Sequence, residues 1–168
     1  MKIFKLAAFL GVVSVLASGV LYFANEVTYP IISAANIAHL NESLGEFYPG
    51  AEFDVEDAAS DAITQKIQVT QNGENIATIY HLNFVGFNPG IDMLVAINAD
   101  GTLHGIDVLG HAETPGFGSQ IETNETWRSQ FTTRTVNDQI DTISGATITT
   151  RAVNAAVQEA FADFKANQ

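Results

Sequence analysis

The sequence predicts an α+β protein: a single N-terminal transmembrane helix followed by an extracytoplasmic domain, in which helices flank a mostly antiparallel sheet. Three features predict it: an uncharged apolar segment near the N-terminus, apolar–polar alternation in the middle of the chain, and a helical apolar stripe at its end. The 168 residues match the length of one ordinary domain. We expect residues 1–26 to form a cytoplasmic stub and the transmembrane helix, residues 27–65 a helical connection, and residues 66–168 the functional domain.

The apolar segment Leu6–Phe23 contains no charged residue. As a helix it is about 27 Å long, enough to cross a bilayer core. Lys2 and Lys5 precede it and the next basic residue is Lys66, so we expect a single pass through the cell (inner) membrane with a cytoplasmic N-terminus. A cleaved signal peptide is the alternative because it shares the basic start, although no clear A-x-A cleavage site follows. Whether the anchor stays attached after export is left open.

The charge of the exported part excludes one large class of function. All 19 acidic residues lie at or beyond Glu26, where only five of the seven Lys and Arg residues are found. Such a negative surface repels phosphate backbones, so we expect no nucleic-acid partner. The chain contains no cysteine, which removes disulfides, thiol catalysis and thiolate-bound metal centres.

Between the membrane segment and the sheet we expect one more helix and a connection. Ile37, Leu40 and Leu44 share one face of a helix over Ser33–Phe47, which ends at Tyr48-Pro49-Gly50. The acidic stretch Glu52–Asp61 lacks the pattern of a calcium loop, and we expect a solvated connection there instead of a metal cluster.

Strands then dominate up to Leu109. The dipeptide Asn72-Gly73 is typical of a tight hairpin turn, and Asn98-Ala99-Asp100-Gly101 is a second turn. The positions that follow a period of two are Ile67, Val69, Ile76, Thr78, Tyr80, Leu82, Ile91, Met93, Val95 and Ile97. These patterns predict a meander of neighbouring antiparallel strands.

Two helices follow the sheet. The segment Asn124–Phe131 is expected to be a short helix. The last helix begins near Ile148, and its apolar stripe consists of Val153, Val157, Ala160, Phe161 and Phe164.

The segment Asp141–Thr150, which enters the last helix, is rich in small and hydroxyl residues. The free N–H groups and the dipole at a helix start suit a bound phosphate, and Gly145 and Ala146 permit close approach. The plainer interpretation is that Ser144 or Thr147 caps the helix with its hydroxyl.

A second cluster, His111–Gly118, follows the last strand. Thr114 before proline is expected to be extended, and Pro115-Gly116 suits the centre of a type II turn. The loop is either a structural turn or a frame for an acid–base pair formed by His111 and Glu113. The other histidines have no metal-ligand spacing.

With these two clusters in order, the chain resembles the G subunit of the Rnf electron-transport complex. It resembles more distantly the C subunit of the sodium-pumping NADH:quinone oxidoreductase. The resemblance covers nearly the whole chain: Asn25–Ile31 resembles the family's post-membrane N-x-x-T-x-P-x-I stretch, and His111–Gly118 its H-x-E-T-P-G-x-G loop, with Trp127 downstream. Asp141, Ser144, Gly145, Ala146 and Thr147 match every fixed position of the D-x-x-S/T-G-A-T flavinylation motif.

The resemblance implies that residues 66–168 form an FMN-binding domain with covalent FMN. The family's attachment site is the last threonine of the motif, Thr147, joined through a phosphoester by a flavin transferase that uses FAD. Ser144, Gly145 and Ala146 would shape the phosphate turn, and Asp141 would be read by the transferase. Glu113, Thr114, Gly116 and Phe117 are further expected cofactor-binding residues. Phe117 either packs on the isoalloxazine ring or fills the core.

The function implied by the resemblance is that of an electron-carrier subunit of an Rnf-type complex, which links ferredoxin oxidation to NAD reduction and ion transport. Its partners would be the other membrane and iron–sulfur subunits, with no turnover on this chain alone. The chain is short for the family, so a freestanding flavinylated carrier is an alternative. A non-redox, membrane-anchored binding module is the alternative from another class.

Overall fold

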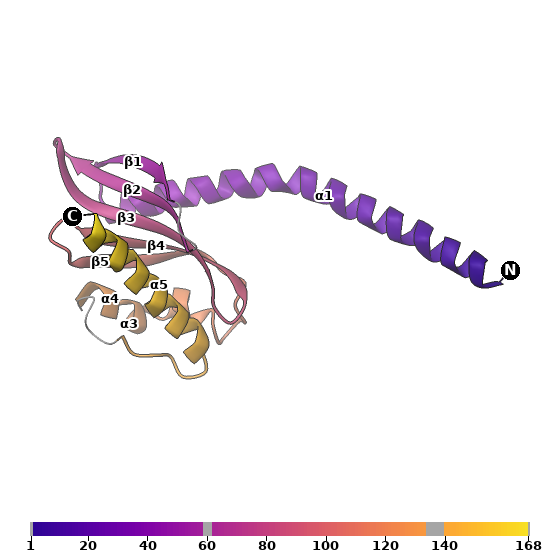
Figure 1. The fold of residues 1–168 in the computed structure, drawn as a ribbon. Coiled ribbons are helices and arrows are strands. Elements are labelled where there is room, and N and C mark those ends of the chain that lie inside the picture. The colour runs from indigo at the N-terminus through magenta and orange to yellow at the C-terminus, as the bar shows by residue number, and fades with distance from the viewer. Residues whose placement is uncertain (1, 59–61, 134–139, 168) are drawn as a thin grey trace. The chain divides into compact units, whose positions relative to one another are not determined.

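The computed structural model describes residues 2–58, 62–133 and 140–167, and the chain divides into two compact units (Figure 1). The first unit is Met1–Asn41 and the second is Glu42–Gln168, which contains the sheet. The division of the chain at residues 26 and 65 stays a prediction.

Helix α1 (Lys2–Phe47) is continuous, so the two N-terminal helices expected from the sequence are a single helix. Its backbone remains helical through Pro30. The part Ala7–Glu26 has a mean hydropathy of 2.1 over 20 residues and none of it is buried within the protein. Length and composition therefore suit a membrane span, as the sequence predicts.

The second unit contains the predicted meander. Each strand pairs antiparallel with the next along the chain, in the order β1-β2-β3-β4-β5. The strands are β1 (Glu52–Asp57), β2 (Ile63–Gln71), β3 (Glu74–Val85), β4 (Pro89–Asn98) and β5 (Leu103–Gly110). Asn72 and Gly73 both have positive φ, 54° and 83°, as a two-residue hairpin of type I′ requires.

Strand β1 overturns the expectation for the acidic stretch. Glu52–Asp57 is an edge strand, paired with β2 from Glu52 opposite Thr70 to Asp57 opposite Gln65. Its acidic residues hide the strand signal, and such charges also discourage pairing of an exposed edge with another chain. The end of the predicted connection, residues 59–61, lies outside the described residues.

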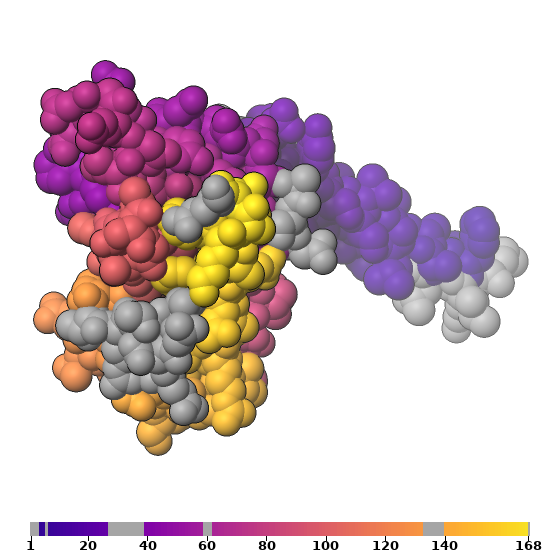
Figure 2. All heavy atoms as spheres, turned by 60° about the vertical axis from the view of Figure 1, so that its left-hand side comes forward, coloured from indigo at the N-terminus to yellow at the C-terminus, as the bar shows by residue number. Residues whose placement is uncertain are grey.

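Helix α5 (Thr147–Ala166) covers one face of the sheet, and its predicted apolar stripe is buried (Figure 1). Three short helices complete this layer: α2 (Gln120–Thr123), α3 (Glu125–Arg128) and α4 (Gln130–Thr133). The helix expected over Asn124–Phe131 is thus present as α3 and the first half of α4. Figure 2 shows the outer side of α5 (yellow) on the surface, beside the β4–β5 turn, where Gly101 approaches Phe164.

The end of α1 that belongs to the second unit contacts the opposite face of the sheet. Ser43 Oγ donates to Asp107 Oδ2 at 2.6 Å and Tyr48 OH to Asn98 Oδ1 at 2.8 Å. The ring of Tyr48 also packs on that of His104. Because both faces are covered, β3 and β4 contain continuous buried runs where a one-sided sheet would alternate.

Candidate functional site

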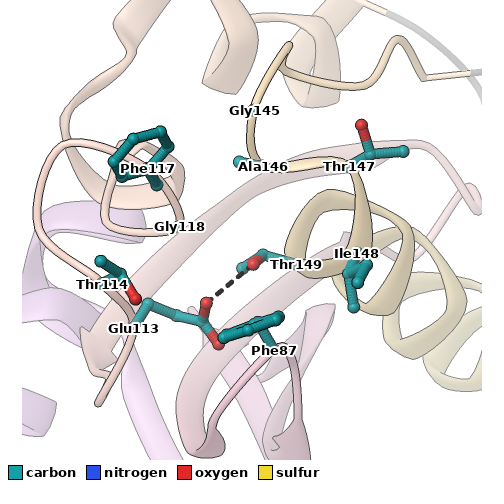
Figure 3. Close-up of a pocket in the computed structure, with 10 residues that line it drawn as sticks. All are labelled: Phe87, Glu113, Thr114, Phe117, Gly118, Gly145, Ala146, Thr147, Ile148 and Thr149. Atoms are coloured by element: carbon teal, nitrogen blue, oxygen red, sulfur yellow. Dashed lines mark hydrogen bonds between the residues drawn. The ribbon is translucent and has the colours of Figure 1, made fainter.

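A pocket of about 440 Å³ lies where the start of α5 meets the loop after β5 and the β3–β4 connection (Figure 3). Its walls combine apolar side chains, hydroxyls and one carboxylate. The lining residues are Phe87, Glu113, Thr114, Phe117, Gly118, Gly145, Ala146, Thr147, Ile148 and Thr149.

The start of α5 is not capped by a side chain. The N-cap residue is Ala146, and no hydroxyl accepts a bond from the first turn. The expectation that Ser144 or Thr147 is the cap is therefore wrong: Ser144 is exposed before the helix, and Thr147 is its first residue. Gly145 has a φ of 84°, a left-handed conformation that lets the chain turn sharply into the helix. The free N–H groups of this turn can bind an anion.

The first turn of α5 contains three threonines, whose hydroxyls differ in burial and in hydrogen bonding. Thr149 Oγ1 is buried and donates to Glu113 Oε2 at 2.7 Å. Thr150 Oγ1 is buried and donates to the carbonyl of Ala146 at 3.0 Å. Thr147 is partly exposed and lines the pocket, and among the described residues no hydrogen bond engages its hydroxyl. Of the three, Thr147 is the one open to chemistry.

The loop after β5 contains the predicted type II turn. Phe117 N–H donates to the carbonyl of Thr114 at 3.1 Å, and Gly116 has a φ of 78°. The turn presents Thr114 and Phe117 to the pocket, whereas Gly116 is not among the lining residues. Phe117 is 57% exposed, so its interpretation as a core residue is wrong. Its ring lies near Gly145.

Glu113 is buried beside the pocket with 5% of its surface exposed. Its Oε1 accepts the backbone N–H of Asn88 at 2.9 Å, and its Oε2 accepts the Thr149 hydroxyl. The His111 ring instead contacts Glu122, with 3.1 Å from Nε2 to Oε2, and meets Glu113 through the backbone N–H alone. The two side chains have separate partners, so the alternative of an acid–base pair formed by His111 and Glu113 is wrong.

Asp141 is exposed and is not among the pocket-lining residues. Its carbonyl accepts the indole N–H of Trp127 at 2.6 Å, and its own N–H donates to Gln130 Oε1 at 3.1 Å. Its backbone thus ties the start of the motif to α3 and α4.

The structure brings six of the expected residues to the pocket, and Ser144, Gly116 and Asp141 do not line it. Those at the pocket are Glu113, Thr114, Phe117, Gly145, Ala146 and Thr147. Sequence reasoning did not assign Phe87, Gly118, Ile148 and Thr149 to the site. Phe87 and Ile148 are 63% and 58% exposed, apolar side chains at a pocket edge. The sequence feature that could have indicated Phe87 is its position as an aromatic residue inside the glycine-rich segment Gly86–Gly90. Among the described residues, no group of three metal-ligating side chains occurs.

Comparison with known proteins places this pocket in a known family of domains. Residues 86–162 match the FMN-binding domain family. The chain is 33% identical to the G subunit of an ion-translocating oxidoreductase complex from Cereibacter sphaeroides, over 86% of this chain and 76% of that protein. It is 29% identical to the G subunit of the Na⁺-translocating ferredoxin:NAD⁺ oxidoreductase complex of Acetobacterium woodii, over 92% and 88% of the two chains.

The fold also has a relative among solved structures. The crystal structure of Shewanella oneidensis NqrC matches with a TM-score of 0.51 and 23% identity, over 64% of this chain and 63% of that one. The α+β architecture predicted from the sequence is therefore confirmed, and NqrC has a similar fold.

Proposed function

Because the chain belongs to the family of the G subunits of ion-translocating oxidoreductase complexes, we propose that it is a membrane-anchored electron-carrier subunit of such a complex, of the Rnf type. The match of residues 86–162 to the FMN-binding domain family makes FMN its cofactor. The finer part of the proposal is that the FMN is joined to Thr147 through a phosphoester.

The pocket suits a flavin phosphate at its α5 end. The uncapped helix start offers N–H groups and a positive dipole end, and Thr147 supplies the only one of the three neighbouring hydroxyls that the protein leaves accessible there. Arg151 is exposed and follows Thr147 by about one turn on the same face of the helix, which adds positive charge close by.

The attachment reaction uses Thr147 as the nucleophile and FAD as the donor. Thr147 Oγ1 forms a bond to the phosphorus of the FMN half, the pyrophosphate bond breaks, AMP leaves and the hydroxyl proton is released. A threonine hydroxyl is a weak nucleophile at neutral pH, so a separate flavin transferase is needed. Asp141, exposed and outside the pocket, is accessible for recognition by that enzyme.

The rest of the pocket suits the flavin ring. The exposed aromatic rings of Phe87 and Phe117 offer flat apolar surfaces for a ring, and Gly145 lets the chain approach the phosphate end closely. Bound FMN supplies one-electron and two-electron redox chemistry, while the protein fixes its position and its surroundings.

The N-terminal part of α1 would anchor this domain on the outer side of the membrane, with the N-terminus in the cytoplasm. Lys2 and Lys5 before the apolar segment support this orientation. The electron partners would be the other membrane and iron–sulfur subunits of the complex.

The observation that carries the proposal is that Thr147 is partly exposed and lines the pocket, while the hydroxyls of Thr149 and Thr150 are buried and donate hydrogen bonds within the protein. The test is co-expression of the full chain with a flavin transferase, followed by denaturing electrophoresis under ultraviolet light and mass spectrometry. Thr147→Ala is the test variant. Thr142→Ala is the matched control because Thr142 is exposed in the same segment, at a variable position of the motif.

We expect a fluorescent band with one added FMN mass in the wild type and in Thr142→Ala, and none in Thr147→Ala. A band that persists in Thr147→Ala would refute the linkage. A wild type without fluorescence, beside a flavinylated protein that is labelled in parallel, would refute covalent flavin and favour a membrane-anchored binding module.

A further inference from the structure

We propose that Glu113 lowers the reduction potential of the flavin as a fixed negative charge in the wall of the pocket. This inference rests on the proposed function, since it requires FMN in this pocket. It assigns Glu113 an electrostatic role toward the cofactor, in addition to its contacts within the protein.

Glu113 has the geometry of a buried carboxylate. Both of its oxygens accept hydrogen bonds, Oε1 from the backbone N–H of Asn88 and Oε2 from the hydroxyl of Thr149. Only 5% of its surface is exposed, and none of the ion pairs among the described residues involves it. Two neutral donors satisfy its oxygens, and no Lys, Arg or His of the described part of the chain forms an ion pair with it.

The position of this carboxylate is fixed by its surroundings. Gly86 and Gly118 approach it so closely that a Cβ built on either would collide with the Glu113 side chain. Asn88 and Thr149 hold its two oxygens from separate segments, the β3–β4 connection and the first turn of α5. The charge therefore stays beside the pocket and has no room to turn away.

Reduction of a flavin by two electrons and one proton gives the ring a negative charge. A fixed negative charge in a site with little water raises the energy of that reduced form relative to the oxidised one. Figure 3 shows Glu113 beside Phe87 and Thr149, on the other side of the pocket from Thr147. With the phosphate held at Thr147, the ring would lie in the rest of the pocket, which Phe87, Glu113 and Phe117 line.

The experiment separates charge from shape. Glu113→Gln removes the charge but can still accept from Asn88 N–H, whereas Glu113→Asp keeps the charge but is too short for both hydrogen bonds. Glu74→Gln is the matched control, because Glu74 is exposed at the start of β3, roughly 35 Å along that strand from the pocket end. The full flavinylated chain is titrated electrochemically while the flavin absorbance is followed, and thermal unfolding is recorded for each variant.

We expect Glu113→Gln to shift the potential to a more positive value, with Glu113→Asp closer to the wild type and Glu74→Gln unchanged. Thermal stability should fall more in Glu113→Asp than in Glu113→Gln, because the shorter Asp side chain cannot keep both hydrogen bonds, and it should be unchanged in Glu74→Gln. An unshifted potential in Glu113→Gln would overturn the proposal. It would also be overturned if Glu113→Asp moved the potential as far as Glu113→Gln did, because the effect would then follow shape.

The fluorescent band on the denaturing gel keeps the two proposals distinguishable. Loss of flavin in the Glu113 variants alone would make Glu113 a residue needed for attachment and overturn the tuning role. Absence of flavin from the wild type would overturn the proposed function and this inference together. Normal labelling of all variants without a shift would overturn only this inference.

Discussion

Replacing Gly118 by alanine should destabilise the protein through one neighbour, the side chain of Glu113. An alanine Cβ at position 118 would overlap Glu113 Oε2 and lie 2.8 Å from its Cβ and 3.0 Å from its Cδ. The φ of Gly118 is not in the left-handed region, so the backbone itself accepts alanine. Because Glu113 is buried and bonded at both oxygens, it has no free rotamer to move into.

The expected cost follows from the two ways in which the clash can be relieved. Forcing an extra methyl group into a packed site costs about 1–3 kcal/mol. Displacing Glu113 loses its hydrogen bonds, and a bond to a charged group contributes about 1.5–3 kcal/mol. The protein adopts the less costly route, so we expect a loss of up to about 3 kcal/mol in the free energy of unfolding. For a chain of this size that lowers Tm by at most roughly 6–12 °C.

The assay is a double-mutant cycle measured by urea denaturation of the full chain in detergent, with Gly118→Ala, Glu113→Ala and the double variant. In the double variant the overlaps with Oε2 and Cδ are gone and only the 2.8 Å approach to the Cβ of residue 113 remains, so the added cost of Gly118→Ala should be clearly smaller than in the wild type. Gly110→Ala is the control, because no atom of the described residues lies within 4 Å of a Cβ built there and its φ is ordinary. Additive single effects, or equal losses in Gly118→Ala and Gly110→Ala, would refute the role of Glu113 in the clash.

Three further predictions concern the core, alkaline pH and topology. Phe161→Ala should cost about 3–5 kcal/mol in urea denaturation because Phe161 is 2% exposed, whereas Phe87→Ala, at an exposed site, should leave stability nearly unchanged. Burial, and then the charge of Asp100, raises the pKa of Tyr48 to about 12, so the folded state retains a proton that the unfolded chain releases near pH 10. Stability should therefore fall as pH rises from about 10 to about 12, and Tyr48→Phe should flatten that fall in pH-dependent unfolding. Because the chain has no native cysteine, Phe4→Cys and Glu74→Cys each create a single thiol. A membrane-impermeant thiol reagent on intact cells should label the second alone, and labelling of Phe4→Cys would reverse the proposed orientation.

Local patterns were sufficient for most of the second unit. The hairpin at Asn72-Gly73, the strand β4 and the apolar stripe of α5 are each encoded within a few neighbouring residues, and all three are confirmed, although both faces of β4 are buried. The sequence did not reveal β1, because an edge strand needs little apolar alternation and its acidic residues look like a solvated connection. It also did not reveal that α1 continues through Pro30, since proline in a sequence normally suggests a helix boundary.

Some of the contacts that form the site could be predicted from the sequence, and others could not. In an antiparallel hairpin, residues equally far from the turn lie opposite each other, so a turn at Asn98–Gly101 already places Asn88 near Ala112. The structure has that contact: Asn88 Nδ2 donates to the Ala112 carbonyl at 2.8 Å. The residues next to these two in the sequence, Phe87 and Glu113, both line the pocket. The bond from Thr149 to Glu113 joins residues 36 positions apart. No local pattern fixes where α5 begins relative to the loop after β5, because that depends on how the helix packs across the sheet. The motif identified the threonine, and packing across the sheet placed a buried carboxylate in the wall of the same pocket.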